Sequence, residues 1–185
     1  MMTLVFLLEE PSAREALKGF LPKILPPGVQ TEFLVYEGKQ DLEKRMVRQM
    51  RAWQRPNSRF VVLRDQDQGD CRTIKRGLLE RCRQAGRPDA VVRIACRDLE
   101  AWFIGDWAAV AQAFGKPNLS RQDAKARYRK PDTVITPVAE LRRFLPGYQK
   151  VDGARRIGPL LAVKRNRSPS FGAFVSAVQR LTRTV

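Results

Sequence analysis

Three acidic side chains follow apolar runs of the sequence, at the points where parallel strands are expected to end. Glu9 comes directly after the apolar residues 4–8, and Asp65 and Asp67 come after the apolar residues 60–63. Ligands of open α/β sheets bind at the carboxyl ends of the strands, so the three carboxylates converge if these strands are neighbours. In a locally extended segment residues i and i+2 point the same way, which lets Asp65 and Asp67 face one ion.

An all-oxygen set of this kind favours a hard divalent cation. The chain contains no histidine, which removes the usual general base near neutral pH and the usual ligand of zinc, copper or nickel. Carboxylates alone select Mg²⁺ or Mn²⁺ before Ca²⁺. A magnesium ion lowers the pKa of its bound water and neutralises a phosphoryl oxygen, so phosphodiester cleavage needs no histidine. The expected cofactor is therefore Mg²⁺ or Mn²⁺.

Other acids near these positions have structural as well as chemical interpretations. Asp70 is expected to cap the helix that follows it, ahead of a role as a further metal ligand. Glu10 replaces Glu9 if the first strand ends one residue later, because side-chain alternation lets only one of the two face the site. Asp98 is expected to cap the next helix. Glu100 lies off the apolar stripe of that helix, which on pattern alone is typical of a solvated surface acid.

Strands and helices must alternate for these acids to meet. Apolar runs predict strands at residues 4–8, 33–36, 60–63 and 91–96. Helical spacing predicts helices between them, one starting with a capping box at Ser12, one over residues 41–53, and one from Asp70 to about Gly86. Parallel neighbours need long crossovers, so this order predicts an α/β fold, a three-layer sandwich with a mostly parallel sheet of about four strands.

The second half of the chain has a helical pattern. We expect a helix capped by Asp106, a polar helix that opens at Ser120, another that starts at Thr136, and a last one that carries Phe171. The chain is therefore predicted to be a single domain, residues 1–185, with a sheet core over residues 1–97 and a mainly helical, basic extension over residues 98–185.

Charge is concentrated in this extension. The net charge is +16, and residues 116–185 hold 16 Lys and Arg against 4 Asp and Glu. This excess indicates a polyanionic partner, most simply nucleic acid, either DNA or RNA, although a generally basic surface with solvated charges is the alternative. The amino-terminal apolar run is short and lacks a basic leader, so we expect a cytoplasmic protein with no membrane span and with three reduced cysteines.

The acidic pattern resembles the Toprim fold, the metal-binding catalytic domain of topoisomerases, primases and nucleases of the overcoming-lysogenization-defect type. Such domains place a glutamate after the first strand, as at Glu9, and Asp-x-Asp after the third, as at Asp65 and Asp67. Glu10 stands where that fold usually has glycine. More closely, the chain resembles a bacterial family, the domain of unknown function numbered 4276, over residues 8–15, 36–41, 62–71, 97–103 and 148–155.

This resemblance implies a metal-dependent nuclease that acts with an ATPase partner in phage defence. It also implies that Glu100, two residues ahead of Trp102, completes the acidic cluster. Lys150 becomes a candidate for neutralising the charge on a cleaved phosphate. Four further cations are expected to contact phosphates without reading sequence, namely Arg155, Arg156, Arg165 and Arg167.

Two other functions remain open on the sequence. The first is a non-catalytic, nucleic-acid-binding partner of that ATPase, in which the acids bind a regulatory ion. The second is a receiver-like or nucleotide-binding α/β domain. Against the latter, no Gly-x-Gly-x-x-Gly follows the first strand, no Gly-Lys-Ser/Thr loop is present, and the paired acids follow the third strand.

Overall fold

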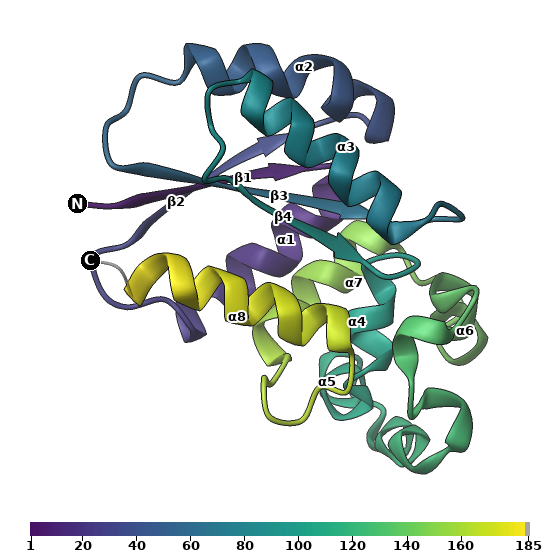
Figure 1. Ribbon diagram of the computed structural model, residues 1–185. Coiled ribbons are helices and arrows are strands. Elements are labelled where there is room, and N and C mark those ends of the chain that lie inside the picture. Colours follow the sequence, from purple (N-terminus) through teal and green to yellow (C-terminus); the bar gives the residue numbers. More distant parts are fainter. Residues whose placement is uncertain (184–185) are drawn as a thin grey trace.

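A four-stranded parallel sheet forms the centre of the molecule. The computed structural model describes residues 1–183 (Figure 1). The strands lie in the order β2-β1-β3-β4 and all pair in parallel, which confirms the predicted α/β class. Their bounds are β1 (Thr3–Leu8), β2 (Gln30–Val35), β3 (Ser58–Asp65) and β4 (Val91–Ala95).

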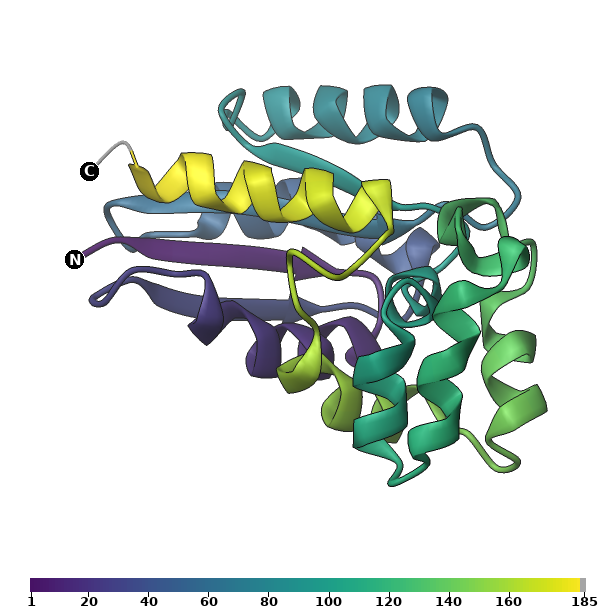
Figure 2. The ribbon, with the colours of Figure 1, turned by 90° about the horizontal axis from the view of Figure 1, so that it is seen from below.

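Helices cover both faces of this sheet and complete the three layers. The crossovers are α1 (Pro11–Phe20), α2 (Lys39–Ala52) and α3 (Cys71–Gln84). The second half adds α4 (Glu100–Ile104), α5 (Trp107–Ala113), α6 (Pro137–Phe144), α7 (Lys150–Ile157) and α8 (Pro169–Arg183). Figures 1 and 2 place α2 and α3 on one face and α1 and α8 on the other, and α4 to α7 extend the second layer past the carboxyl ends of the strands.

Side-chain alternation in β1 and β3 builds a separate core on each face. One core contains Leu4, Phe6 and Leu8 of β1 together with Val61 and Leu63 of β3. The other contains Val5 and Leu7 with Phe60 and Val62, packed under α2 and α3. Every residue of β1 is buried, as its continuous apolar run predicts for a central parallel strand. The same alternation decides where the polar residues after each strand point.

The second half of the chain packs into the first core. Trp102 of α4 lies against Phe171 and Phe174 of α8, with ring centroids 5.3 and 5.1 Å apart. Its indole Nε1 donates a 2.9 Å hydrogen bond to Ser170 Oγ. The expected helix carrying Phe171 is therefore present and covers the sheet beside β4.

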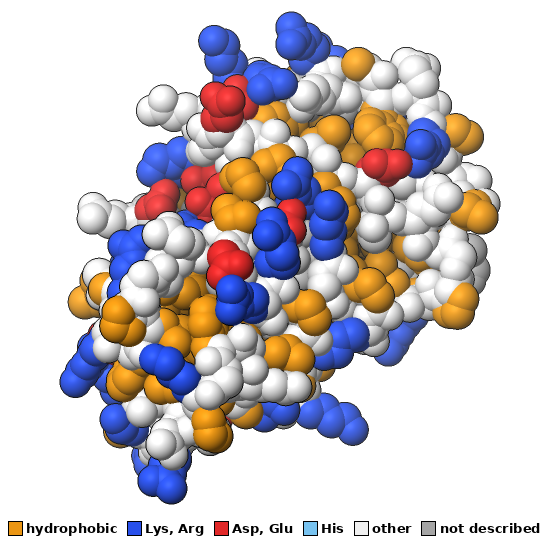
Figure 3. All heavy atoms as spheres, turned by 180° about the vertical axis from the view of Figure 1, so that it is seen from behind, with side chains coloured by type: hydrophobic (Ala, Val, Ile, Leu, Met, Phe, Trp, Pro, Cys, Tyr) orange, Lys and Arg blue, Asp and Glu red, His pale blue; other side chains and the backbone are white. Residues whose placement is uncertain are grey.

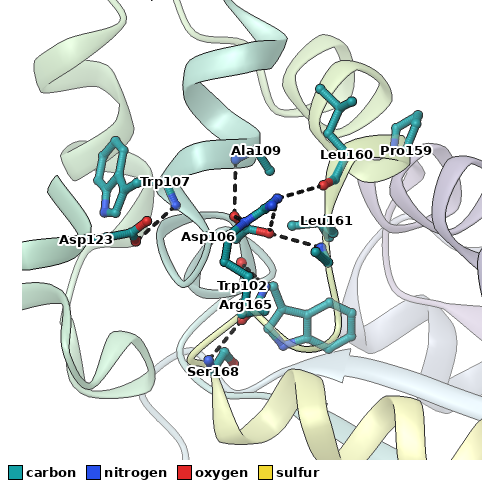
Figure 4. Close-up of polar contacts among 12 residues, drawn as sticks. Trp102, Asp106, Trp107, Ala109, Asp123, Pro159, Leu160, Leu161, Arg165 and Ser168 are labelled. Atoms are coloured by element: carbon teal, nitrogen blue, oxygen red, sulfur yellow. Dashed lines mark hydrogen bonds and ion pairs between the residues drawn. The ribbon is translucent and has the colours of Figure 1, made fainter. Parts of the chain in front are cut away.

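Asp106 holds several parts of this layer together. It caps α5, as expected, by accepting a hydrogen bond from the Ala109 backbone N–H at 3.1 Å. Its carboxylate also accepts a hydrogen bond from Ala162 N at 3.0 Å. Arg165 Nε donates a further hydrogen bond to it at 2.5 Å (Figure 4). Asp106 has no exposed surface, so its charge is balanced by these donors rather than by water.

Three local expectations are wrong. Asp98 does not cap the helix that follows it, because the N-cap of α4 is Leu99 and no side-chain hydrogen bond caps this helix. No capping box starts α1, because the helix begins at Pro11, which needs no hydrogen-bond partner for its nitrogen, and Ser12 Oγ donates to Glu10 Oε1 instead. The polar stretch from Ser120 does not open an α-helix. It forms 3-10 helices at Pro117–Ala124 and Ala126–Tyr128, because prolines bound the stretch and few of its side chains are apolar enough to pack.

Two further findings concern the whole chain. The three cysteines are free thiols, as expected, and Cys71 Sγ lies 3.9 Å from Cys96 Sγ. None of the helices in residues 1–183 is both long enough and apolar enough to cross a membrane.

Candidate functional site

The strand order reverses between β1 and β3, which makes their carboxyl ends the switch point of the sheet. The chain moves from β1 outward to β2, then returns to the other side of β1 with β3. In open α/β sheets this is the place where a ligand binds. Leu8 pairs with Leu63 in the parallel register. Glu10 and Asp65 each lie two residues further on, so both belong to the face that carries α1.

Four carboxylates and one ammonium gather on this face. The acidic cluster consists of Glu10, Asp65, Asp98 and Glu100, and Lys150 lies among them. Lys150 Nζ lies 2.5 Å from Glu10 Oε1 and 3.8 Å from Glu100 Oε2. These groups come from the ends of β1 and β3 and from the starts of α4 and α7.

Burial raises the pKa values of the acids in this cluster. Glu100 has no exposed surface, and burial, opposed by Lys150, raises its pKa to about 8. Burial likewise raises the pKa of Asp98 to about 6. The pKa of Asp65 is raised well above its ordinary value by burial and by the charges of Glu10 and Glu100. Without a further cation, some of these acids hold protons at neutral pH.

Lys150 keeps its charge in these surroundings. Burial alone lowers the pKa of an ammonium, but Glu100 and Glu10 reverse that effect and raise the pKa of Lys150 above its usual range. Two carboxylate oxygens stay without a hydrogen-bond partner among the described residues, Asp98 Oδ1 and Glu100 Oε2. One lysine therefore does not satisfy all the acids around it.

Tyr148 supports Glu100 and had no role in the sequence predictions. Its hydroxyl donates to Glu100 Oε1 at 3.3 Å, and its ring is buried. Gly153 makes room for it, because a Cβ at that position would lie 2.1 Å from the Tyr148 ring. The signal in the sequence is a tyrosine two residues before Lys150 and five before Gly153, in the loop just ahead of a helix whose start no capping pattern marks.

The helical pattern around Glu100 predicts an acid on the protein surface, and this prediction is wrong. Glu100 is completely buried. The reason is that α4 has five residues, all of them buried, so it has no solvated face.

Glu9 and Asp67 lie on the other side of the strand ends. Glu9 Oε2 accepts a hydrogen bond from Asp65 N at 3.1 Å and lies 3.8 Å from Arg64 Nε. Asp67 pairs with Lys39 at 2.9 Å. Alternation turns Glu9 away from the face of Glu10. Asp67 does not follow Asp65, because β3 has ended and Asp67 has a left-handed backbone with φ 54°.

The remaining predicted site residues have contacts of their own. Asp70 caps α3 by accepting from Thr73 N at 2.8 Å, and this hydrogen bond lowers its pKa. The four predicted phosphate contacts are all engaged: Arg155 with Glu15 at 3.0 Å, Arg156 with Asp152 at 2.8 Å, Arg165 with Asp106, and Arg167 with the Asp123 carbonyl. Figure 3 shows Lys and Arg side chains spread over the face opposite to the view of Figure 1.

The acidic cluster offers the donor chemistry of a divalent-cation site. All its donors are carboxylate oxygens, which suits Mg²⁺ or Mn²⁺, and two of the buried oxygens accept no hydrogen bond from the described residues. Within residues 1–183, however, no three acidic or cysteine side chains are already arranged around one point as metal ligands. Lys150 lies between them instead, so an ion fits these residues only if the lysine and carboxylates shift.

Comparison with known proteins identifies a family. No curated protein and no solved structure matches the chain. The sequence matches the family described as domain of unknown function (DUF4276) over residues 8–179, which is nearly the whole chain and includes the complete acidic cluster and Lys150. The chain belongs to the DUF4276 family.

Proposed function

We propose that this protein is a Mg²⁺- or Mn²⁺-dependent nuclease that cleaves phosphodiester bonds at the acidic cluster. The observation that carries the proposal is the placement of four carboxylates at the switch point of a parallel sheet, where Glu100 Oε2 and Asp98 Oδ1 are buried and have no hydrogen-bond partner within residues 1–183. Keeping several acids together in a dry site costs stability unless a cation joins them. The resemblance to Toprim nucleases agrees with this proposal at Asp65 and Glu100, but not at Glu9 and Asp67.

Each residue has a role in the proposed reaction. Glu10, Asp65 and Glu100 would hold the ion, which would supply an activated water and neutralise a phosphoryl oxygen. Asp98 borders the site, where its carboxylate would accept hydrogen bonds from water. Lys150 would exchange its contact with Glu10 for one with the phosphate, where negative charge builds up during cleavage. Tyr148 keeps Glu100 oriented through its hydrogen bond.

The proposal shifts the ligand set relative to the sequence prediction. Glu10 replaces Glu9, since Glu10 shares a face with Asp65 and already contacts Lys150. Asp67 and Asp70 are given no ligand role, because they pair with Lys39 and cap α3. An ATPase partner and a role in defence against foreign nucleic acid are part of the same proposal and rest on the resemblance alone.

A second function has one observation in its favour. Lys150 already neutralises part of the acidic cluster, and residues 1–183 hold no ready-made set of three ligands. This arrangement suits a non-catalytic nucleic-acid-binding partner of the ATPase, in which an ion binds weakly and regulates assembly.

Cleavage assays separate the two functions. Purified protein is incubated with single-stranded DNA, duplex DNA and RNA, with Mg²⁺, with Mn²⁺ or with EDTA, and with or without the cognate ATPase. Metal-dependent products from the wild type that Asp65→Asn and Glu100→Gln abolish support the nuclease. If wild type and both variants are equally inert with the ATPase present, the nuclease proposal is wrong. Metal-dependent binding without products then supports the second function.

A further inference from the structure

A cleft borders the acidic cluster on its β4 side. It has a volume of about 850 Å³ and lies between the loops that follow β3 and β4 and the start of α6. Figures 1 and 2 show α6 beyond the carboxyl edge of the sheet, next to α4. We call this cleft the basic cleft. Its charged lining residues are Lys39, Arg64, Asp67, Arg97, Asp98 and Arg142.

Two of its cations have no carboxylate partner among the described residues. Lys39 is paired with Asp67, and Arg64 is paired with Glu43 at 2.5 Å. Arg97 forms no side-chain hydrogen bond or ion pair within residues 1–183. Arg142 makes one long contact, from Nε to the Tyr148 carbonyl at 3.5 Å. The guanidinium groups of Arg97 and Arg142 therefore line the cleft without a carboxylate partner among the described residues. Arginine is the side chain whose planar geometry best matches phosphate oxygens.

The backbone at Arg97 is held in an unusual conformation. Its φ is 66°, in the left-handed region that residues with a side chain rarely adopt. The loop after β3 fixes it, because Arg97 N donates to Gln66 Oε1 at 3.0 Å and the Arg97 carbonyl accepts from Asp67 N at 2.7 Å. Such conformations persist where the surrounding structure enforces them, and they concentrate at binding sites. Here the restraint fixes a lining residue of the basic cleft.

The basic cleft and the acidic cluster share a residue. Asp98 lines the cleft, and its charge adds to the effect of burial in raising the pKa of Glu100 and Tyr148 inside the cluster. Arg142 contacts the residue that supports Glu100, namely Tyr148. A ligand held by Arg97 and Arg142 therefore lies in a cleft that Asp98 of the acidic cluster also lines.

We propose that the basic cleft binds a short single-stranded segment of nucleic acid through its phosphates, with Arg97 and Arg142 as the contacts. This inference rests on the proposed function and names how its substrate is held. The volume lies in the range of small-ligand pockets, which is too small for a duplex. No aromatic ring is among the lining residues, so bases are not stacked there, and Ile135, 76% exposed, and Val138 supply aliphatic contact instead. Binding is therefore independent of sequence.

Binding without metal tests the inference separately from catalysis. Fluorescence anisotropy of a labelled ten-nucleotide oligothymidylate is measured with EDTA over a series of salt concentrations. Arg142→Ala removes one contact at an exposed position of α6. Arg97→Asn removes the other, since asparagine tolerates the left-handed backbone. Each variant is expected to bind at least fivefold more weakly and to lower the salt slope by about 0.7. Arg121→Ala and Arg129→Ala, two exposed arginines outside the cleft, are the matched controls.

Each outcome decides one of the two proposals. If Arg97→Asn and Arg142→Ala bind no more weakly than Arg121→Ala and Arg129→Ala, the cleft is not the binding site. Tighter binding of a ten-base-pair duplex than of the single strand also overturns the inference. Circular dichroism and a thermal melt establish that each variant is folded, and Arg142→Ala carries the test if Arg97→Asn is not. If binding depends on both arginines but metal produces no cleavage, the basic cleft stands and the nuclease proposal fails.

Discussion

Lys150 Nζ lies 2.5 Å from Glu10 Oε1, which pairs the first residue of α7 with the residue that precedes α1. The two helices pack along each other, so this ion pair closes one end of their contact at the carboxyl edge of β1. Glu10 also accepts from Ser12 Oγ at 2.7 Å. The lysine therefore has a fixed position among the acids, where a bound cation would compete with it.

The first prediction separates neighbouring acids by the face they occupy. Glu10→Gln and Asp65→Asn are expected to weaken Mn²⁺ binding at least tenfold, because both carboxylates belong to the acidic cluster. Glu9→Gln and Asp67→Asn are the matched controls and should bind Mn²⁺ like the wild type, since these acids contact Arg64 and Lys39. Isothermal titration calorimetry or Mn²⁺ electron paramagnetic resonance measures the affinity. The reverse order of effects would place the ion on the other side of the strand ends.

Lys150→Met should lower the free energy of unfolding by about 1–3 kcal/mol at pH 8. The loss is smaller than for a fully buried ion pair, because the Lys150 side chain is 32% exposed and the acids can take up protons. Millimolar Mg²⁺ should restore more stability to this variant than it adds to the wild type, since the ion replaces the ammonium. Urea unfolding checks both effects. Lys164→Met, on an exposed lysine, serves as the control, and equal losses in the two variants contradict the prediction.

The stability of the metal-free protein should fall as the pH rises from 5 to 8. Burial raises the pKa of Asp98 to about 6 and of Glu100 to about 8, so the folded state holds protons that the unfolded chain releases near pH 4. The folded state then binds more protons than the unfolded state, and the free energy of unfolding decreases with pH. Denaturant unfolding at several pH values measures the slope. Glu100→Gln removes one titrating carboxyl group and should make the free energy of unfolding depend less steeply on pH. A wild-type stability that increases between pH 5 and 8 would contradict the raised pKa values.

Asp106→Ala should be among the most destabilising single changes, at about 2–4 kcal/mol. The substitution leaves two buried backbone N–H groups without their acceptor and removes the partner of Arg165, whose side chain is 45% exposed. Asp152→Ala removes an exposed pair with Arg156 and should cost no more than about 0.5 kcal/mol. Chemical denaturation of both variants gives the comparison. Similar values would mean that the Asp106 interactions contribute no more than a surface ion pair.

Two glycines are expected to respond in opposite ways to replacement by alanine, because Gly158 packs against α1 and Gly172 has free space around it in α8. A Cβ at Gly158 would lie 2.5 Å from the Ala16 carbonyl oxygen, so Gly158→Ala should destabilise the protein by about 1–3 kcal/mol. A Cβ at Gly172, inside α8, would meet nothing within 4 Å. Gly172→Ala should therefore stabilise by about 0.5–1 kcal/mol through the helix backbone. Thermal melts distinguish the two, and a destabilised Gly172→Ala would contradict the packing of α8.

Periodicity predicted the sheet, its crossover helices and α8, because their apolar residues repeat at the spacing of buried strands and helices. The face on which an acid lies was harder to predict. Alternation assigns Asp65 to the face of Leu63, but only the register of Leu8 with Leu63 shows that Glu10, and not Glu9, shares it. Register is a property of the assembled sheet and cannot be predicted from the sequence of either strand alone.

The contributions of α4 and α7 to the site depend on tertiary packing. Glu100 is buried because α4 is enclosed on all sides, which a five-residue pattern does not reveal. The helix α7 has no side-chain cap at its start, and its close approach to α1 depends on Gly158 meeting Ala16. The Ser120 stretch shows the converse, since its polar pattern fits a helix and the chain forms 3-10 turns instead.

The acidic cluster and Lys150 come from four separate parts of the sequence, near residues 10, 65, 100 and 150. During synthesis the carboxylates emerge long before the lysine that balances them. A nascent or truncated chain that lacks α7 therefore has these carboxylates without the ammonium of Lys150 among them.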